Sequence, residues 1–271
     1  MNLIKNDLYH DTTHIDEWEK LKQFTDARIA IGRAGCSIPT QAMLEFQLAH
    51  AQARDAVYQV LDTTNIQKNL KKIGLESLAV HSQALDKEEY LKRPDLGRVI
   101  NNEAKQILQH YQEKNNQPFD VCIVIGDGLS ALAIEENAVS FISALKMYIE
   151  QEKWSLAPII IASGSRVALG DQVAEIFNAK MLIMLIGERP GLSSPDSMGI
   201  YYTWEAKTGF LDAKRNCISN VRPAGLSIAI AVQRLMNLMK KSNELGYSGV
   251  NLKDEHEVVS IEQYTEIKRL F

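Results

Sequence analysis

The second half of the chain alternates between apolar runs, glycine-bearing loops and amphipathic helices, and this alternation constrains the fold more than any other feature. Continuous apolar runs lie within FDVCIVIGDG (119–128), APIIIAS (157–163) and KMLIMLIGERPG (180–191). Parallel strands that are buried on both faces have this pattern, and helices connect them. The sequence therefore predicts an α/β fold with a doubly wound, mostly parallel, Rossmann-like sheet.

Two weaker strands are expected after these runs. In GIYYTWEA (199–206), aromatic residues alternate with polar ones, which favours an antiparallel or edge strand. A short strand near RNCISNVR (215–222) then leads to a helix, LSIAIAVQRLMNLMKKS (226–242). The sheet domain is therefore predicted over residues 118–253.

The first 117 residues instead have helical patterns, and they predict a smaller helical domain before the sheet. Apolar residues recur at helical spacing over 40–60, where a mostly buried helix is expected, and over 96–114. Asp86 and Glu89 have the spacing of a capping box, and Asp95 is expected to cap the helix after Pro94. The polar stretch 115–117 before Pro118 marks the boundary. The charged residues 254–271 are expected to form a peripheral C-terminal tail.

Composition excludes several classes of protein. The chain has 271 residues and a formal net charge of −4, so no electrostatic footprint favours nucleic acid or an anionic membrane. No apolar run approaches the ~20 residues that span a bilayer. Three cysteines without a C-x-x-C motif fit a reducing, cytoplasmic setting.

The loops after the predicted strands are the best place for a ligand, since open α/β sheets bind ligands at the carboxyl ends of their strands. The loops are Gly126–Ser130, Ser163–Gly170, Gly187–Leu192 and Asn220–Gly225. Their polar candidates are Asp127, Ser163, Ser165, Arg166, Glu188, Arg189 and Arg222. So many small residues suit a large, flat ligand that the backbone approaches, although Glu188 and Arg189 also fit solvated loop charges.

The segment GDGLSA (126–131) matches G-x-G-x-x-A, a variant of the dinucleotide fingerprint. The second strand ends in Ile161-Ala162-Ser163, however, without the acidic residue that holds the ribose. The alternatives are a plain tight turn in which Asp127 caps the next helix, or another ligand on this loop.

Nucleophilic and metal-binding patterns are lacking. No G-x-S-x-G occurs, and Cys122 lies within a strand, where cysteines usually pack. Spacing assigns no role to Cys36 or Cys217. His10 and His14 are four residues apart but lack the glutamate of H-E-x-x-H, so no metal site is predicted.

Five blocks closely resemble the light chain of ethanolamine ammonia-lyase. They are GRAGCSIPTQAMLEFQLAHAQARDAV (32–57), YLKRPDLGRVI (90–100), VIGDGLSALAI (124–134), GERPGL (187–192) and RNCISNVRPAG (215–225). The resemblance covers residues 18–253 in order, and the combination of blocks is far more specific than one glycine motif.

The resemblance implies the small subunit of a lyase that depends on adenosylcobalamin and converts ethanolamine to acetaldehyde and ammonia by a radical mechanism. It implies a TIM-barrel heavy chain that binds the substrate, a cobalamin between the two chains, and a higher hetero-oligomer of both. The light chain's corrin contacts correspond to Val167, Glu188 and Cys217. No catalytic residue is expected on this chain, because the chemistry belongs to the cofactor and the substrate site to the heavy chain.

Many cobalamin domains carry D-x-H-x-x-G, whose histidine binds cobalt, and this motif is absent here. We therefore expect the cofactor to keep its own dimethylbenzimidazole on cobalt. The family also implies a bacterial microcompartment, although MNLIKNDLYHDTTHIDE is not a clear targeting segment. The alternatives are a free-standing Rossmann-type oxidoreductase that uses GDGLSA, and a binding or scaffold module without a cofactor.

Overall fold

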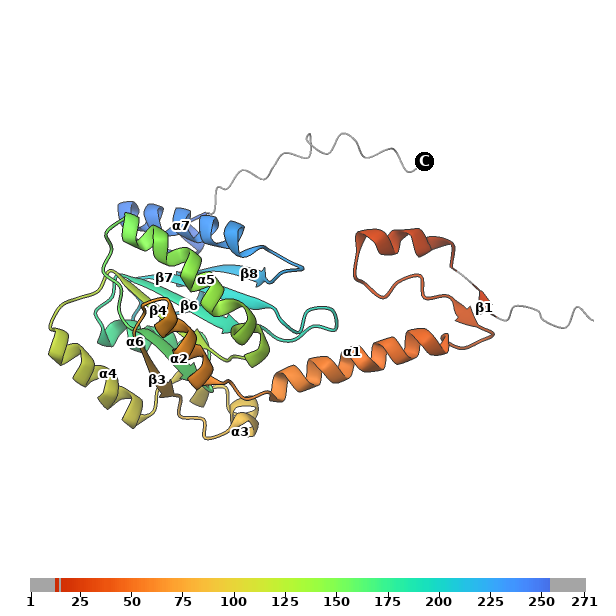
Figure 1. Cartoon of the computed structure of the whole chain (residues 1–271), viewed down its shortest axis with the longest axis horizontal. Helices are drawn as coiled ribbons and strands as arrows, with labels where there is room; N and C mark the ends of the chain where they lie inside the picture. Colours follow the sequence, from red (N-terminus) through yellow and green to blue (C-terminus); the bar gives the residue numbers. More distant parts are fainter. Residues whose placement is uncertain (1–12, 15, 254–271) are drawn as a thin grey trace, which may run out of the picture.

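A mixed six-stranded sheet lies between layers of helices in a computed structural model that describes residues 13–14 and 16–253 (Figure 1). The strand order is β3-β5-β4-β6-β7-β8. The bounds are Ser77–His81 for β3, Val121–Gly126 for β4, Ile159–Ser163 for β5, Met181–Gly187 for β6, Met198–Trp204 for β7 and Arg215–Val221 for β8. Strands β3 to β6 are parallel, while β7 is antiparallel to both neighbours. The predicted α/β class with a mostly parallel sheet is confirmed.

Helices cover both faces of the sheet, so two apolar cores form. Odd-numbered residues of β4, such as Val121 and Ile123, pack into the first core, and even-numbered ones, such as Cys122 and Val124, into the second. The first core includes α5 (Ala131–Gln151), α7 (Ile228–Leu245) and α2 (Thr63–Lys72). The second includes α4 (Asn102–Asn115) and α6 (Leu169–Ile176). Burial on both faces explains why β4 and β6 are apolar throughout.

The two weaker strands are confirmed, and β7 is indeed antiparallel. Strand β8 lies outside β7 and is the edge strand. Only Arg215, Ile218 and Val221 of β8 are buried, so this edge strand is much more exposed than the central strands.

The prediction that the chain before residue 118 is helical is wrong at β3, which pairs with β5 at the other edge of the sheet. The predicted domain boundary at 117/118 falls between α4 and β4, and the sheet extends across it. A strand of five residues at an edge is only partly buried, so it lacks a long apolar run. The C-terminal tail, 254–271, lies outside the described residues.

Helix ends in this part of the chain depend on side-chain caps. Asp86 caps α3 (Lys87–Lys92) by accepting from the Glu89 amide at 2.8 Å, as predicted. Asp95 caps no helix and pairs with Arg93 instead, because a 3₁₀ turn (Leu96–Arg98) interrupts the expected helix. Helix α4 begins only at Asn102, with Asn101 as its cap.

The N-terminal arm, residues 16–39, lies at the far end of the long helix α1 (Thr40–Tyr58) (Figure 1). The arm contains a 3₁₀ helix (Glu17–Phe24) and β2 (Arg33–Ala34), which pairs with β1 (Thr13–His14). Near the other end of α1, Gln59 and the Asp62 amide both donate to the Glu135 carboxylate on α5. The remaining 3₁₀ turns are Asp212–Lys214 and Gly249–Asn251.

Candidate functional site

The predicted loops meet at one edge of the sheet, where β4, β5, β6 and β8 all end. The parallel strands have their carboxyl ends there, and β8 ends beside them because it follows an antiparallel strand. The path of the chain across the sheet also reverses here. Strand β5 lies on one side of β4, and the next strand, β6, lies on the other side of β4. Ligands bind at such switch points in open α/β sheets.

The turn after β4 is packed too closely to hold a pyrophosphate. A Cβ at Gly128, whose φ is +54°, would lie 2.3 Å from the Gly187 carbonyl oxygen, so two loop backbones are in contact. The Leu129 amide donates to that oxygen, and the Ser130 amide donates to the Asp127 carbonyl. These amides are used within the turn, whereas the dinucleotide fingerprint needs them for phosphate oxygens.

The turn is tight, as one alternative predicted, but the prediction that Asp127 caps the following helix is wrong. The Ser130 side chain caps α5 by accepting from the Ala133 amide. The Asp127 carboxylate instead accepts from the amides of Gly164 (3.0 Å) and Ser165 (2.9 Å) in the loop after β5. Asp127 thus holds the loop that carries Val167 against the turn after β4.

A cationic cluster that the sequence did not predict surrounds Asp127. Lys87 lies 3.9 Å from its carboxylate and donates to the Gly128 carbonyl. The Tyr90 ring lies 4.9 Å from the Lys87 ammonium and 4.5 Å from the Arg166 guanidinium. Burial raises the pKa of Asp127 and lowers the pKa of Lys87, while their mutual attraction opposes both shifts. Lys87 has no local sequence pattern that would reveal this contact.

Glu188 follows β6 and is oriented by two donors. Its Oε2 accepts from the Ser197 hydroxyl at 2.5 Å and from the Asn220 amide at 3.2 Å. Its Oε1 lies over Gly199, where a Cβ would be only 2.9 Å away. No hydrogen bond to Oε1 occurs within the described part of the chain, so this oxygen can accept from a ligand. Glu188 is therefore more than a solvated loop charge, whereas Arg189 is exposed.

Cys217 lies opposite Tyr201 on the two antiparallel strands, β8 and β7. Side chains directly opposite each other on paired strands are neighbours on one face of the sheet, so the Tyr201 and Cys217 side chains lie side by side. Partial burial raises the pKa of this thiol, and the Glu188 charge adds to the shift. Burial raises the pKa of Tyr201 to about 12, with contributions from Cys217 and Glu188. Tyr201, which the sequence did not single out, thus places Glu188 and Cys217 in one neighbourhood.

Val167 is half-buried in the loop between β5 and α6, and it packs on the same core as Tyr201. Val167 and Glu188 therefore follow β5 and β6 at the carboxyl end of the sheet, whereas Cys217 lies within β8, level with Tyr201 and with Met184 in the middle of β6. Other candidates are structural: Ser165 is fully buried, and Arg222 is 8% exposed and donates to Asn220 and Ser193. Cys122 is fully buried with a pKa raised to about 12, as a packing residue should be.

Comparison with known proteins shows the family of the chain. The sequence model of the family described as ethanolamine ammonia-lyase light chain (EutC) matches residues 15–253. The chain belongs to this family. Among its curated relatives, the ethanolamine ammonia-lyase small subunit of Pseudomonas fluorescens Pf0-1 is 48% identical over 245 residues, which are 90% of this chain and 89% of the relative.

Other members of the light-chain family match over a similar extent. The small subunit of Pseudomonas syringae pv. tomato DC3000 is 46% identical over 95% of this chain and 90% of its own length. The small subunit of Pseudomonas aeruginosa UCBPP-PA14 is 47% identical over 93% of this chain and 92% of its own length. The predicted resemblance to the light chain is confirmed, and the match includes the arm and α1 as well as the sheet.

Proposed function

We propose that this chain is the small subunit of an ethanolamine ammonia-lyase and that it holds adenosylcobalamin against the heavy chain. Family membership carries this proposal, and the position of Val167 and Glu188 after the carboxyl ends of β5 and β6 supports it. When bound, the cofactor supplies the radical chemistry that converts ethanolamine to acetaldehyde and ammonia. The heavy chain, a TIM barrel, would bind the substrate.

The residues at this edge fit a corrin, which is broad, apolar in its faces and surrounded by amide side chains. The Glu188 Oε1 atom lies over a glycine and has an unused acceptor site for an amide N–H. Val167 would pack against the ligand, and Cys217 would be a small, polarisable neighbour. Together these residues would orient the cofactor and keep water from that side of it.

The cofactor is proposed to bind with its own base on cobalt. The ground is the sequence, which lacks the D-x-H-x-x-G motif whose histidine would replace that base. The complex of both chains loaded with cob(II)alamin should therefore show superhyperfine splitting in its EPR spectrum from the dimethylbenzimidazole nitrogen. Uniform ¹⁵N labelling of the protein should leave that splitting unchanged, and a changed splitting would mean that a histidine is the lower ligand.

The alternative of a dinucleotide-dependent oxidoreductase has no support at the GDGLSA turn, because its amides are used internally. In the part of the chain that the structure describes, no helix has the length and apolar character to span a membrane. Location in a bacterial microcompartment is proposed from the family alone.

A cobalamin titration in the presence of the heavy chain tests the proposal directly. The wild-type pair should bind cobalamin, and Glu188→Ala should weaken binding about tenfold, which corresponds to about 1.4 kcal/mol. Glu244→Ala, an exposed glutamate near the end of α7, is the control and should bind like wild type. Saturable binding of NADH, with no binding of cobalamin, would instead favour the oxidoreductase.

A further inference from the structure

Helix α1 buries its small side chains and exposes its large ones, which reverses the usual arrangement. Its buried residues are Ala49, Ala53 and Ala56. The exposed ones include Met43, Leu44, Phe46 and Leu48, with exposed fractions between 38% and 60%. Clusters of exposed apolar side chains on a soluble protein mark places where a partner binds.

The N-terminal arm extends this apolar surface. Ile31 and Ile38 from the arm line a hollow of about 240 Å³ together with Met43 and Phe46 from α1. A second hollow of about 420 Å³ runs along α1 from Phe46 to Tyr58. Phe46 lines both, so the two hollows form one continuous surface. We define the arm–helix surface by the exposed side chains Ile31, Ile38, Met43 and Phe46, which line the first hollow.

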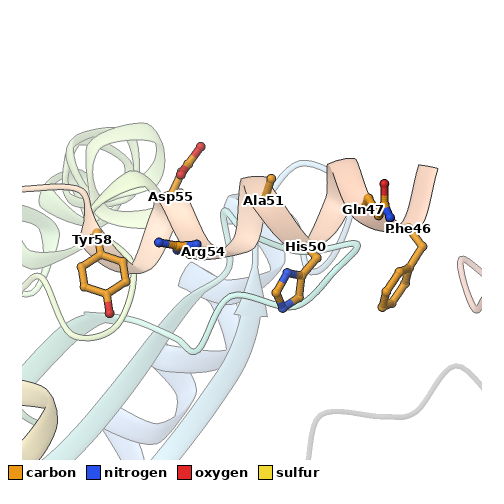
Figure 2. A pocket seen from close by; sticks show the side chains of 7 residues that line it. All are labelled: Phe46, Gln47, His50, Ala51, Arg54, Asp55 and Tyr58. Atoms are coloured by element: carbon orange, nitrogen blue, oxygen red, sulfur yellow. The ribbon is translucent and has the colours of Figure 1, made fainter. Parts of the chain in front are cut away.

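The second hollow presents aromatic and cationic groups on one side of α1. Figure 2 shows Phe46, His50, Arg54 and Tyr58 on the same side of the helix, with Asp55 on the other. Phe46 and His50 stack with their ring centroids 6.3 Å apart. Within residues 16–253, Arg54 forms no ion pair, and its charge is free to meet a carboxylate on a partner.

The arm–helix surface is connected to the candidate cofactor site through the loop after β6. The Arg28 guanidinium donates to the Leu192 carbonyl at 3.3 Å, and the Ser193 hydroxyl donates to the Asp26 carbonyl at 3.5 Å. Glu188 is the first residue of the same loop. A partner that covers both the arm and this loop would therefore also reach the carboxyl edge of the sheet.

From these observations we infer that the arm–helix surface is the docking site for the heavy chain, an inference that rests on the proposed function. The relatives are named small subunits, which implies a larger partner, and the contacts of Arg28 and Ser193 place this surface next to the loop that begins at Glu188. The matching surface on the heavy chain should be an apolar ridge with an acidic residue opposite Arg54.

Co-purification of the full chain with the heavy chain tests this assignment. The double variant Met43→Asp/Phe46→Asp should bind the heavy chain at least tenfold more weakly, whereas Phe46→Leu should bind like wild type. Leu211→Asp is the matched control, because Leu211 is 75% exposed. It lies in the connection between β7 and β8, at the end of the sheet where the parallel strands begin. All variants should keep the wild-type melting temperature in circular dichroism, since the replaced side chains are exposed.

Three results would contradict the inference. If wild type and the double variant bind the heavy chain equally, only the assigned surface is wrong. If the double variant loses self-association but keeps the heavy chain, the surface belongs to a second copy of this chain. If wild type neither binds the heavy chain nor supports ethanolamine turnover with it, the proposed function is wrong as well.

Discussion

At the scale of single residues, Cys217 and Cys36 offer a comparison within one molecule. Both are exposed, but only Cys217 lies beside Tyr201 and Glu188 at the candidate site. The raised pKa keeps the Cys217 thiol protonated near pH 8. Because the thiolate is the form that reacts, iodoacetamide should alkylate Cys217 slowly at pH 8 and faster at higher pH. Mass spectrometry of the two tryptic peptides measures both rates.

Added cobalamin and heavy chain should protect Cys217 from this alkylation, by about tenfold or more. Heavy chain without cobalamin is the control for protection by the protein interface alone. Equal rates with and without cobalamin would remove Cys217 from the cofactor site. Cys122 should react only after unfolding, because it is fully buried.

Gly128 and Gly246 both have a positive φ, but only one of them is confined by its neighbours. At Gly128 a Cβ would collide with the Gly187 backbone, while at Gly246 nothing lies within 4 Å. Gly246→Ala should therefore lower the free energy of unfolding by about 1–2 kcal/mol, which is the cost of the left-handed backbone conformation for a residue with a Cβ. Gly128→Ala should cost more, because a backbone atom cannot move aside as a flexible side chain can. Urea unfolding of both variants measures the difference, and equal losses would contradict this account.

At the scale of elements, a buried ion pair joins the edge strand β8 to helix α6. Arg215 donates two hydrogen bonds to the Asp171 carboxylate, at 2.5 and 2.8 Å, and both side chains are 1% exposed. This pair determines how β8 lies against α6, and Cys217 is two residues further along the same strand.

Removing one partner of this pair leaves a buried, uncompensated charge. Arg215→Met should lower the free energy of unfolding by about 3–5 kcal/mol, as measured by urea denaturation. The double variant Asp171→Leu/Arg215→Met should recover much of that loss, since no charge then remains buried. A double variant as unstable as the single one would mean that packing, and not charge, dominates at this position.

Some elements could be predicted from the residues within and next to them. The apolar strands β4 and β6 and the cap at Asp86 were predictable, because burial on both faces and helix capping depend on nearby residues. Strand β3 was not, since its pairing with β5 joins residues about 80 positions apart. Partial burial at the edge leaves only a short mixed segment in the sequence.

At the scale of the whole molecule, the proposed function divides the work between two chains. Purified light chain with adenosylcobalamin and ethanolamine should produce no acetaldehyde, because the substrate site is expected on the heavy chain. Addition of the heavy chain should restore turnover, which a coupled alcohol dehydrogenase assay detects. Acetaldehyde formation by the light chain alone would refute this division of labour.

The sequence by itself determined the α/β class, the helices that flank the sheet and the membership in the light-chain family, because these depend on periodicity and on ordered blocks of residues. Only the tertiary structure decided that Asp127 holds the loop of Val167, that Gly199 makes room for Glu188 and that Tyr201 joins Cys217 to this neighbourhood. Each of these contacts joins separate segments of the chain. The same holds for α1, whose apolar periodicity predicted a mostly buried helix although the fold leaves its large side chains exposed.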